Sequence, residues 1–212
     1  MGLYVESVFD KVTNTLQDDG VRWSPEELLR WFNDGQRQIC RFHPEAYTIN
    51  EATALAAGSK QTLPETGLML VKVINNMGTD GATEGDVITH IDQDIMDAQS
   101  PSWHSTTQSA TIKHYMFDPR DPKTYFVYPP ADGTTQIRIV YSKVPPDAEI
   151  GGTSVIDNIY EPDLVSYILY WAYQKDADFG ANHARTQGYL QAFMASMGVI
   201  EPQEHKMEPK DK

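Results

Sequence analysis

The fold is decided by one stretch, "LVSYILYWAYQKDADFGANHARTQGYLQAFMASMG", which spans residues 164–198. Apolar side chains run nearly all the way round its first part, from Leu164 to Tyr173. A helix with this pattern is buried on all sides, so other segments must cover it. A second helix, expected from about Asn182, carries an apolar stripe that includes Tyr189 and Phe193.

The start of the chain supplies two further helices. Residues 3–17 place apolar side chains at spacings near 3.6, which predicts an amphipathic helix. The segment 24–42, "SPEELLRWFNDGQRQICRF", opens with Ser24 as N-cap and Pro25 at the first helical position. Glu27 lies at the capping-box spacing from that serine, so a helix should begin here.

The middle of the chain changes character from about Tyr47, where short β-prone runs are separated by Gly, Pro and Asp turns. The runs "ATIKHYMF", "KTYFVYPP" and "TTQIRIVYSKV" predict a meander of antiparallel strands. The segment 75–86, "NNMGTDGATEGD", is rich in glycine and acid and is expected to be a mobile loop.

This order of elements predicts an α+β fold: a four-helix bundle formed by the N- and C-terminal helices, with an inserted antiparallel β-rich region. The aromatic side chains of the last two helices are then mostly core. In so small a bundle they still leave surface uncovered, which contacts between copies of the chain would bury. The expected parts are the N-terminal helices (1–46), the β-rich insertion (47–157), the C-terminal helices (158–198) and a flexible tail (199–212).

Composition and charge argue against several classes of protein function. The net charge of −13 argues against a DNA reader with a basic patch, but an acidic wall that does not grip phosphate suits a DNA conduit. Cys40 is the only cysteine, which excludes an intrachain disulfide and a thiolate metal cluster. Neither a signal peptide nor a membrane-spanning run is recognisable, and we expect a soluble, unexported protein.

Motifs for chemistry are few. There is no phosphate-binding glycine loop, nucleophile elbow or His-Glu-x-x-His pattern, so no catalytic, cofactor or metal site is predicted. His90, Asp92 and Asp94 would share one face of a strand and could hold a divalent metal, although a solvated edge is the commoner explanation. His104 lies between two serines, but adjacency supplies neither a base nor an orienting group.

Several segments in order resemble one family. Residues 53–75, "TALAAGSKQTLPETGLMLVKVIN", are similar to a stretch of tailed-phage adaptor proteins. "DIMDAQSPSW" (94–103) and "FDPRDPKTYFVYPP" (117–130) follow in the family's order, as does the aromatic segment "YILYWAYQKDAD" (167–178). The resemblance covers about residues 4–198 and points to the head-to-tail adaptors of short-tailed phages, also called tail tubular protein A or gatekeeper.

The resemblance implies a structural, non-enzymatic role. About twelve copies would form a closed ring below the portal protein and above the tail tube or nozzle protein. Genomic DNA would pass through the ring without sequence-specific binding, and neither a cofactor nor a membrane would be involved. The protein would be made in the host cytoplasm and reside at the head–tail junction of the virion. Another neck or tail-completion protein, or a small enzyme with an unfamiliar site, are the alternatives.

The resemblance also implies three groups of site residues. The ring interface would fall on the aromatic positions Tyr167, Tyr170, Trp171, Tyr173, Tyr189 and Phe193. The portal would be contacted by tail residues represented by Ile200, His205, Lys206 and Met207. The channel or the tail would be faced by the loop acids Asp80, Glu84 and Asp86.

Overall fold

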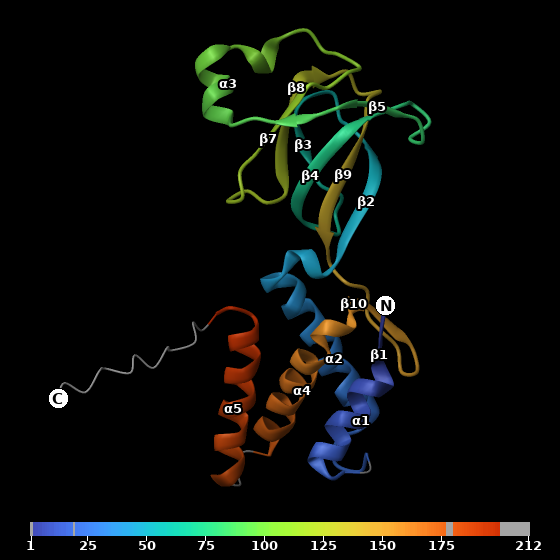
Figure 1. Ribbon diagram of the computed structural model, residues 1–212, viewed down its shortest axis with the longest axis vertical. Coiled ribbons are helices and arrows are strands. Elements are labelled where there is room, and N and C mark those ends of the chain that lie inside the picture. Colours follow the sequence, from blue (N-terminus) through green and yellow to red (C-terminus); the bar gives the residue numbers. More distant parts are fainter. Residues whose placement is uncertain (1, 19, 177–179, 200–212) are drawn as a thin grey trace, which may run out of the picture. The chain divides into compact units, whose positions relative to one another are not determined.

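The computed structural model describes residues 2–18, 20–176 and 180–199. The contacts divide the chain into two compact units. One, the helical unit, combines Met1–His43 with Pro145–Lys212, and the other, the β unit, is the continuous segment Pro44–Val144. Each is described by itself below (Figure 1).

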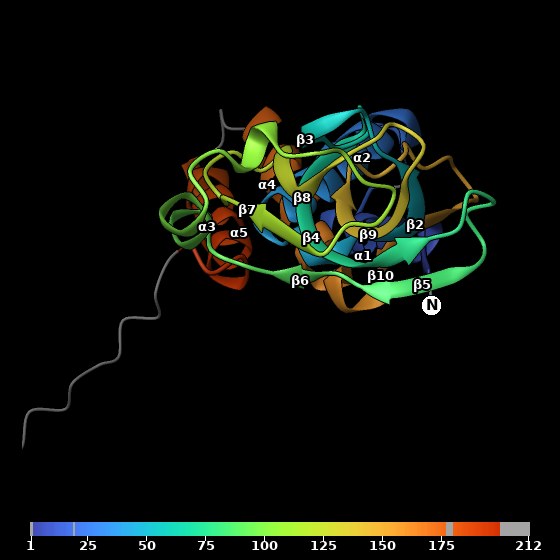
Figure 2. The ribbon, with the colours of Figure 1, turned by 90° about the horizontal axis from the view of Figure 1, so that it is seen from above.

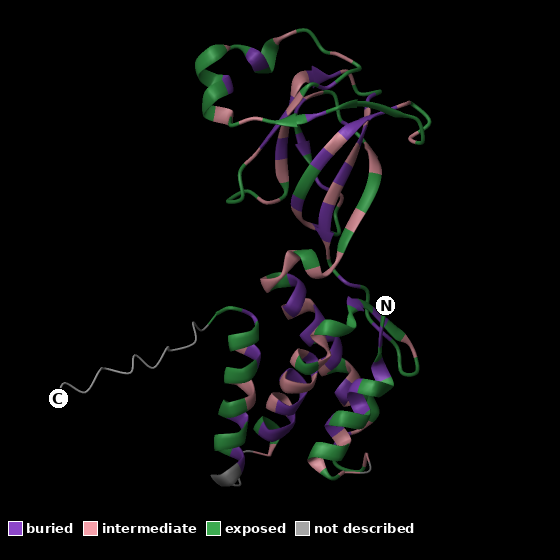
Figure 3. Ribbon diagram, in the orientation of Figure 1, coloured by how far each residue is buried: buried purple, intermediate pink, exposed green. Residues whose placement is uncertain are grey.

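The helical unit has α4 at its centre. Its elements are β1 (Gly2–Tyr4), α1 (Val5–Leu16), α2 (Pro25–Phe42), β10 (Thr153–Asp157), a 3-10 turn (Asn158–Tyr160), α4 (Glu161–Lys175) and α5 (Gly180–Ser196). Helices α1, α2 and α5 all pack against α4, and buried positions follow α4 along its length (Figure 3). The predicted start of α2 is confirmed, because the side chain of Ser24 accepts a hydrogen bond from the backbone N–H of Glu27.

The predicted four-helix bundle is wrong. The described residues form five α-helices and ten strands in three sheets, a mixed α+β fold rich in β structure. The chain start is a strand, because Gly2–Tyr4 pairs antiparallel with Thr153–Asp157. α5 packs chiefly on α4, and a pocket separates its first turns from the end of α1, so it does not close a bundle.

A buried polar cluster joins the two chain segments of the helical unit. Gln36 on α2 is fully buried and donates to the Pro146 carbonyl at 2.8 Å, while its Oε1 accepts from the Ser154 hydroxyl at 2.8 Å. The Asn33 side chain donates to the Ala148 carbonyl at 3.2 Å and accepts from the Ala148 N–H at 2.8 Å. These bonds hold the segment that returns from the β unit firmly against α2, because each satisfies a buried polar group.

The β unit consists of two four-stranded sheets around one apolar core. One sheet has the order β2 (Thr48–Ala54), β9 (Gln136–Lys143), β4 (Gly67–Met77), β5 (Glu84–Val87). The other has the order β3 (Gly58–Thr62), β8 (Thr124–Ala131), β7 (His114–Phe117), β6 (Thr89–His90). Buried side chains from both sheets, among them Val73, Tyr125 and Ile139, form the core.

A smaller apolar cluster lies under α3 (Gln93–Gln99) and the 3-10 turn Trp103–Ser105. Trp103 is fully buried there against Met96 and Met116, and its indole N–H donates to Asp97 at 2.6 Å. In this unit α3 lies at the opposite end from β2 and the β4–β5 turn (Figures 1 and 2).

Two predictions for the β unit are wrong. The predicted meander holds for β7 and β8, but β9 leaves it and pairs with β2 and β4 in the other sheet. The expected mobile loop 75–86 is a hairpin, because β4 continues to Met77 and β5 begins at Glu84. β9 follows its long-range partners because its alternate side chains are buried in the core that β2 and β4 share.

Candidate functional site

The aromatic side chains of α4 and α5 divide into two groups. Three of them, Tyr167, Tyr173 and Phe193, are buried within the chain, with exposed fractions of 9%, 7% and 2%. The rings of Tyr167 and Phe193 lie 5.1 Å apart, which fixes α5 against α4. These three side chains therefore belong to the core of the helical unit, and a neighbouring molecule has little of their surface to bury.

The other three aromatic positions keep part of their surface exposed. Tyr170 and Trp171 on α4 are half-buried and lie with their rings 5.0 Å apart. Tyr189 on α5 is also half-buried, and its ring stacks on that of Tyr173 at 5.7 Å with an angle of 3°. Partly exposed Tyr and Trp side chains are typical of interface positions, since they combine an apolar body with a polar end.

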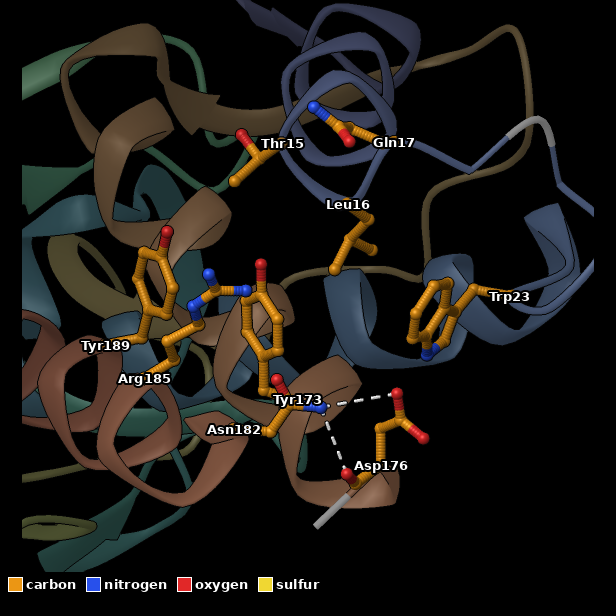
Figure 4. Close-up of a pocket in the computed structure, with 9 residues that line it drawn as sticks. All are labelled: Thr15, Leu16, Gln17, Trp23, Tyr173, Asp176, Asn182, Arg185 and Tyr189. Carbon is orange, nitrogen blue, oxygen red and sulfur yellow. Dashed lines mark hydrogen bonds between the residues drawn. The ribbon is translucent and has the colours of Figure 1, made fainter. Parts of the chain in front are cut away.

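A pocket of about 490 Å³ opens between three helix ends of the same unit (Figure 4). Its walls come from the end of α1 (Thr15, Leu16, Gln17), from Trp23, from the end of α4 (Tyr173, Asp176) and from the start of α5 (Asn182, Arg185, Tyr189). Trp23 lies across the pocket from Arg185 and Tyr189 (Figure 4). The volume falls within the range of about 300–1,000 Å³ that ligand-binding pockets usually have.

The acidic residue of this pocket has hydrogen-bond and ion-pair partners, whereas its Arg185 has no acidic partner among the described residues. Asp176 forms an ion pair with Arg22, and the Asn182 amide donates to the Asp176 backbone carbonyl at 3.1 Å and to its carboxylate at 3.3 Å. The guanidinium of Arg185 lies 5.5 Å from the ring centre of Tyr173, a cation–π contact, and none of the described acidic residues pairs with it. The Trp23 indole N–H is buried and has no hydrogen-bond partner among the described residues.

Sequence reasoning missed this pocket. Tyr173 and Tyr189 stand out as aromatic, but nothing in the sequence joins them to Trp23 or Thr15, which lie about 150 residues earlier. A weak signal existed in α5, the one described α-helix without Asp or Glu, where Arg185 has no acid one turn away within the helix.

The predicted loop acids have different local roles. Asp80 is a turn residue, since its carboxylate accepts from the backbone N–H groups of Ala82 and Thr83, and these bonds lower its pKa. Glu84 pairs with Arg138 at 2.7 Å, and Asp86 is exposed on the edge strand β5. All three side chains are exposed, but the carboxylate of Asp80 is engaged in its own turn and that of Glu84 in an ion pair, so only Asp86 has no bond described for its side chain.

The expectation that His90, Asp92 and Asp94 share one face of a strand is wrong. Strand β6 ends at His90, and Asp92 is the N-cap of α3, with its side chain accepting from the Asp94 N–H at 2.9 Å. The three residues thus do not alternate along one strand. Among the described residues, no group of His, Cys, Asp or Glu has the arrangement of a metal site.

His104 finds a serine partner that the sequence does not suggest. Its Nδ1 lies 2.8 Å from Oγ of Ser59 on β3, whereas Ser102 and Ser105, the serines next to it or nearly so, are not its partners in any described hydrogen bond. The imidazole stacks on Trp103 at 3.6 Å between ring centres. The pair ties β3 to the 3-10 turn, which is a packing role.

Two further findings bear on the predicted partners. The tail positions Ile200, His205, Lys206 and Met207 lie outside the described residues. Within the part of the chain that the structure covers, no helix has the length and apolar character needed to cross a membrane.

Comparison with known proteins identifies the family. A protein-family model described as SU10 adaptor protein matches residues 5–210, which includes both units. A search of curated proteins gives no match. The chain therefore belongs to the SU10 adaptor protein family, whose members are structural phage adaptors and, as virion components, contact other virion proteins.

Proposed function

We propose that this adaptor is a head-to-tail connector of a tailed phage. About twelve copies form a ring below the portal protein, a closed assembly built from one repeated interface. The ring joins the DNA-filled head to a tail tube or nozzle protein and lets the genome pass. The observation that carries the proposal is the family match over residues 5–210, since it covers the helical unit and the β unit together.

The surface of the helical unit supports assembly with neighbours. Tyr170, Trp171 and Tyr189 leave part of their rings exposed, which is the surface that a neighbouring copy would cover. Tyr167, Tyr173 and Phe193 contribute by holding α4 and α5 together behind that surface. In this proposal the first three residues contact the next copy and the other three support them.

The charge of the chain supports the passage of DNA. Thirty acidic against 17 basic residues leave little attraction for phosphate, so a wall of such chains does not retain the duplex. Glu84 and Asp86 at the edge strand β5 are the proposed channel-facing or tail-facing acids. Asp80 shapes their loop through its turn.

The experiment that tests the connector function mixes the purified protein with the portal ring of its phage. Light scattering should show added mass corresponding to a full ring of copies, and negative-stain images should show that ring stacked on the portal. The protein alone is the control. A persistent monomer that leaves the portal unchanged would reject the function, and a ring that joins tail proteins but ignores the portal would indicate a tail-completion protein.

The tail contact has its own test. We propose that residues 200–212, which include Ile200, His205, Lys206 and Met207, contact the portal. A chain that ends at Val199 should keep its fold, measured by circular dichroism and thermal melting, and should lose binding to the portal ring. Unchanged binding by the shortened chain would exclude the tail as the contact.

The proposed role of Glu84 and Asp86 can be tested without disrupting the turn that Asp80 holds. Glu84→Gln and Asp86→Asn together remove two charges, while Asp80 is left in place because its carboxylate accepts three hydrogen bonds within the loop. Virions with this double variant should show altered DNA ejection or tail attachment. If both match the wild type, these acids do not face the channel or the tail.

A further inference from the structure

The Trp23–Arg185 pocket has the chemistry of a carboxylate-binding site. Its Arg185 guanidinium is exposed and lacks an acidic partner among the described residues. Asp176, the acid in the pocket wall, is already neutralised by Arg22 and accepts from Asn182. A cationic donor without a partner in a partly enclosed site favours a ligand that brings an anionic oxygen.

The aromatic wall of the pocket adds an apolar surface beside these donors. The half-buried ring of Tyr189 lies beside Arg185 and stacks on the buried ring of Tyr173, and Leu16 lines the pocket from α1 (Figure 4). A matching ligand therefore carries a carboxylate and an apolar group next to each other. In a peptide, this corresponds to an acidic residue followed or preceded by an aliphatic one.

The same unit presents such a pair elsewhere on its surface. The turn Glu149–Gly152 is closed by a 3.0 Å hydrogen bond from the Gly152 N–H to the Glu149 carbonyl, and Gly151 takes the left-handed backbone that this turn needs. Glu149 is exposed and forms no ion pair among the described residues. Ile150, at the tip, is 48% exposed, so its apolar side chain is available to a partner.

The turn is held firmly in place. The residues before it are fixed by Asn33 and Gln36 of the buried polar cluster, and the Gly152 carbonyl accepts from the Val5 N–H at 3.2 Å. A rigid element loses little conformational entropy on binding, so its tip can dock at low entropic cost.

The turn cannot fill the pocket of its own molecule. In both views the turn lies on one side of the helical unit and α5, which supplies Arg185 and Tyr189, lies on the other (Figures 1 and 2). Two complementary surfaces on opposite sides of one molecule form a head-to-tail interface, the type that closes rings.

We propose that the Glu149–Ile150 tip of one copy docks into the Trp23–Arg185 pocket of the next copy. The Glu149 carboxylate accepts from the exposed Arg185 guanidinium, and Ile150 packs on the half-buried ring of Tyr189. This contact rests on the proposed connector function, and it assigns the repeated interface of the ring to specific residues.

A charge exchange tests the contact. Glu149→Arg and Arg185→Glu should each reduce the number of copies bound to the portal ring by about tenfold or more at a fixed concentration, because like charges then face each other. The double variant restores the opposite-charge pair and should bind within about twofold of the wild type. Asp10→Arg and Arg30→Glu make the same charge changes at other exposed helix positions and should leave assembly unchanged.

A second variant separates the contact from folding. Ile150→Ser removes the apolar group of the exposed tip, so assembly should weaken severalfold while the melting temperature of the free protein is unchanged. If both reversed variants fold and assemble like their controls, or the double variant is no better than either single one, the contact is wrong while the connector function stands. If the wild-type protein adds no mass to the portal ring, both the connector function and the proposed contact are rejected.

Discussion

The two units of this adaptor are held together in different ways. The β unit is one continuous segment whose two sheets enclose a single apolar core. The helical unit is assembled from the two ends of the chain, and the buried polar cluster around Gln36 joins them. It also leaves half-buried aromatic rings and a polar pocket at its surface. The comparison indicates that a continuous segment encloses its own apolar core, whereas the helical unit needs buried polar bonds to join its two segments.

The largest expected effect comes from breaking the polar cluster. Gln36→Leu leaves the Pro146 carbonyl and the Ser154 hydroxyl without their buried partner, which should lower the free energy of unfolding of the helical unit by about 3 kcal/mol. Hydrogen exchange with mass spectrometry in a urea series should show faster exchange in the helical unit and no change in the β unit. Gln38→Leu, at a half-buried position on the same helix, is the matched control.

Equal loss of protection in both units would contradict the separation of the two cores. Cys40 offers an independent measurement, because burial raises the pKa of its thiol to about 11. A thiol reagent at pH 8 should therefore modify Cys40 only when the helical unit opens, and faster in the Gln36 variant.

A smaller effect is expected from Asn76, which is the buried amide side chain of the β unit that corresponds to Gln36 in the helical unit. Asn76 bonds both backbone groups of Ile112, donating at 2.7 Å and accepting at 2.8 Å. Asn76→Leu should lower the free energy of unfolding of the β unit by about 2 kcal/mol and leave the helical unit unchanged. The same exchange experiment measures it, with the exposed Asn50→Leu on β2 as control. A variant that leaves exchange in the β unit unchanged would show that the Asn76 bonds contribute nothing net.

Two glycines of the helical unit should respond in opposite directions to the same substitution. A Cβ on Gly35 would lie 2.8 Å from Cδ2 of Leu164 and 2.9 Å from Cδ1 of Tyr167, both buried on α4. Gly35→Ala should therefore destabilise the unit by about 1.5 kcal/mol through overpacking. Gly188→Ala, which meets nothing within 4 Å, should stabilise α5 by about 0.5 kcal/mol. Thermal melts compare the two, and a Gly35→Ala variant that is as stable as the wild type would refute the close α2–α4 packing.

The smallest effect concerns pH. Hydrogen bonds from Lys11 and Ser7 lower the pKa of Glu161 below its ordinary value of 4.5. Its carboxylate therefore stabilises the folded helical unit above about pH 4.5, and this contribution is lost as the pH falls through the lowered pKa. Glu161→Gln should cost less than about 1 kcal/mol at pH 7, since Lys11 is largely exposed.

Urea titrations at pH 7, 5 and 3 measure this difference, which should shrink towards zero at the lowest pH. Asp10→Asn, on the exposed side of α1, should show no comparable trend. A wild-type advantage that persists at pH 3 would mean that the Glu161 charge is not its source.

Local sequence signals located most of the helices correctly. Ser24, Pro25 and Glu27 fix the start of α2 because a capped first turn needs only neighbours in sequence. The order of adaptor-like segments likewise pointed to a phage adaptor, which the match over residues 5–210 shows, while the assignment to the tail tubular protein A or gatekeeper group stays a prediction. Strand β1 was not predicted, because three residues are too few for a periodic pattern and their pairing with β10 lies about 150 residues away.

The sequence by itself determined the helical segments, the acidic character and the family, because these depend on local periodicity, charge and the order of motifs. The tertiary structure alone decided the partners of β9, the place of Gln36 between two chain ends and the meeting of Trp23 with Arg185 in one pocket. Each of these joins residues far apart in the chain, and long-range packing, rather than any local preference, selects which of them meet.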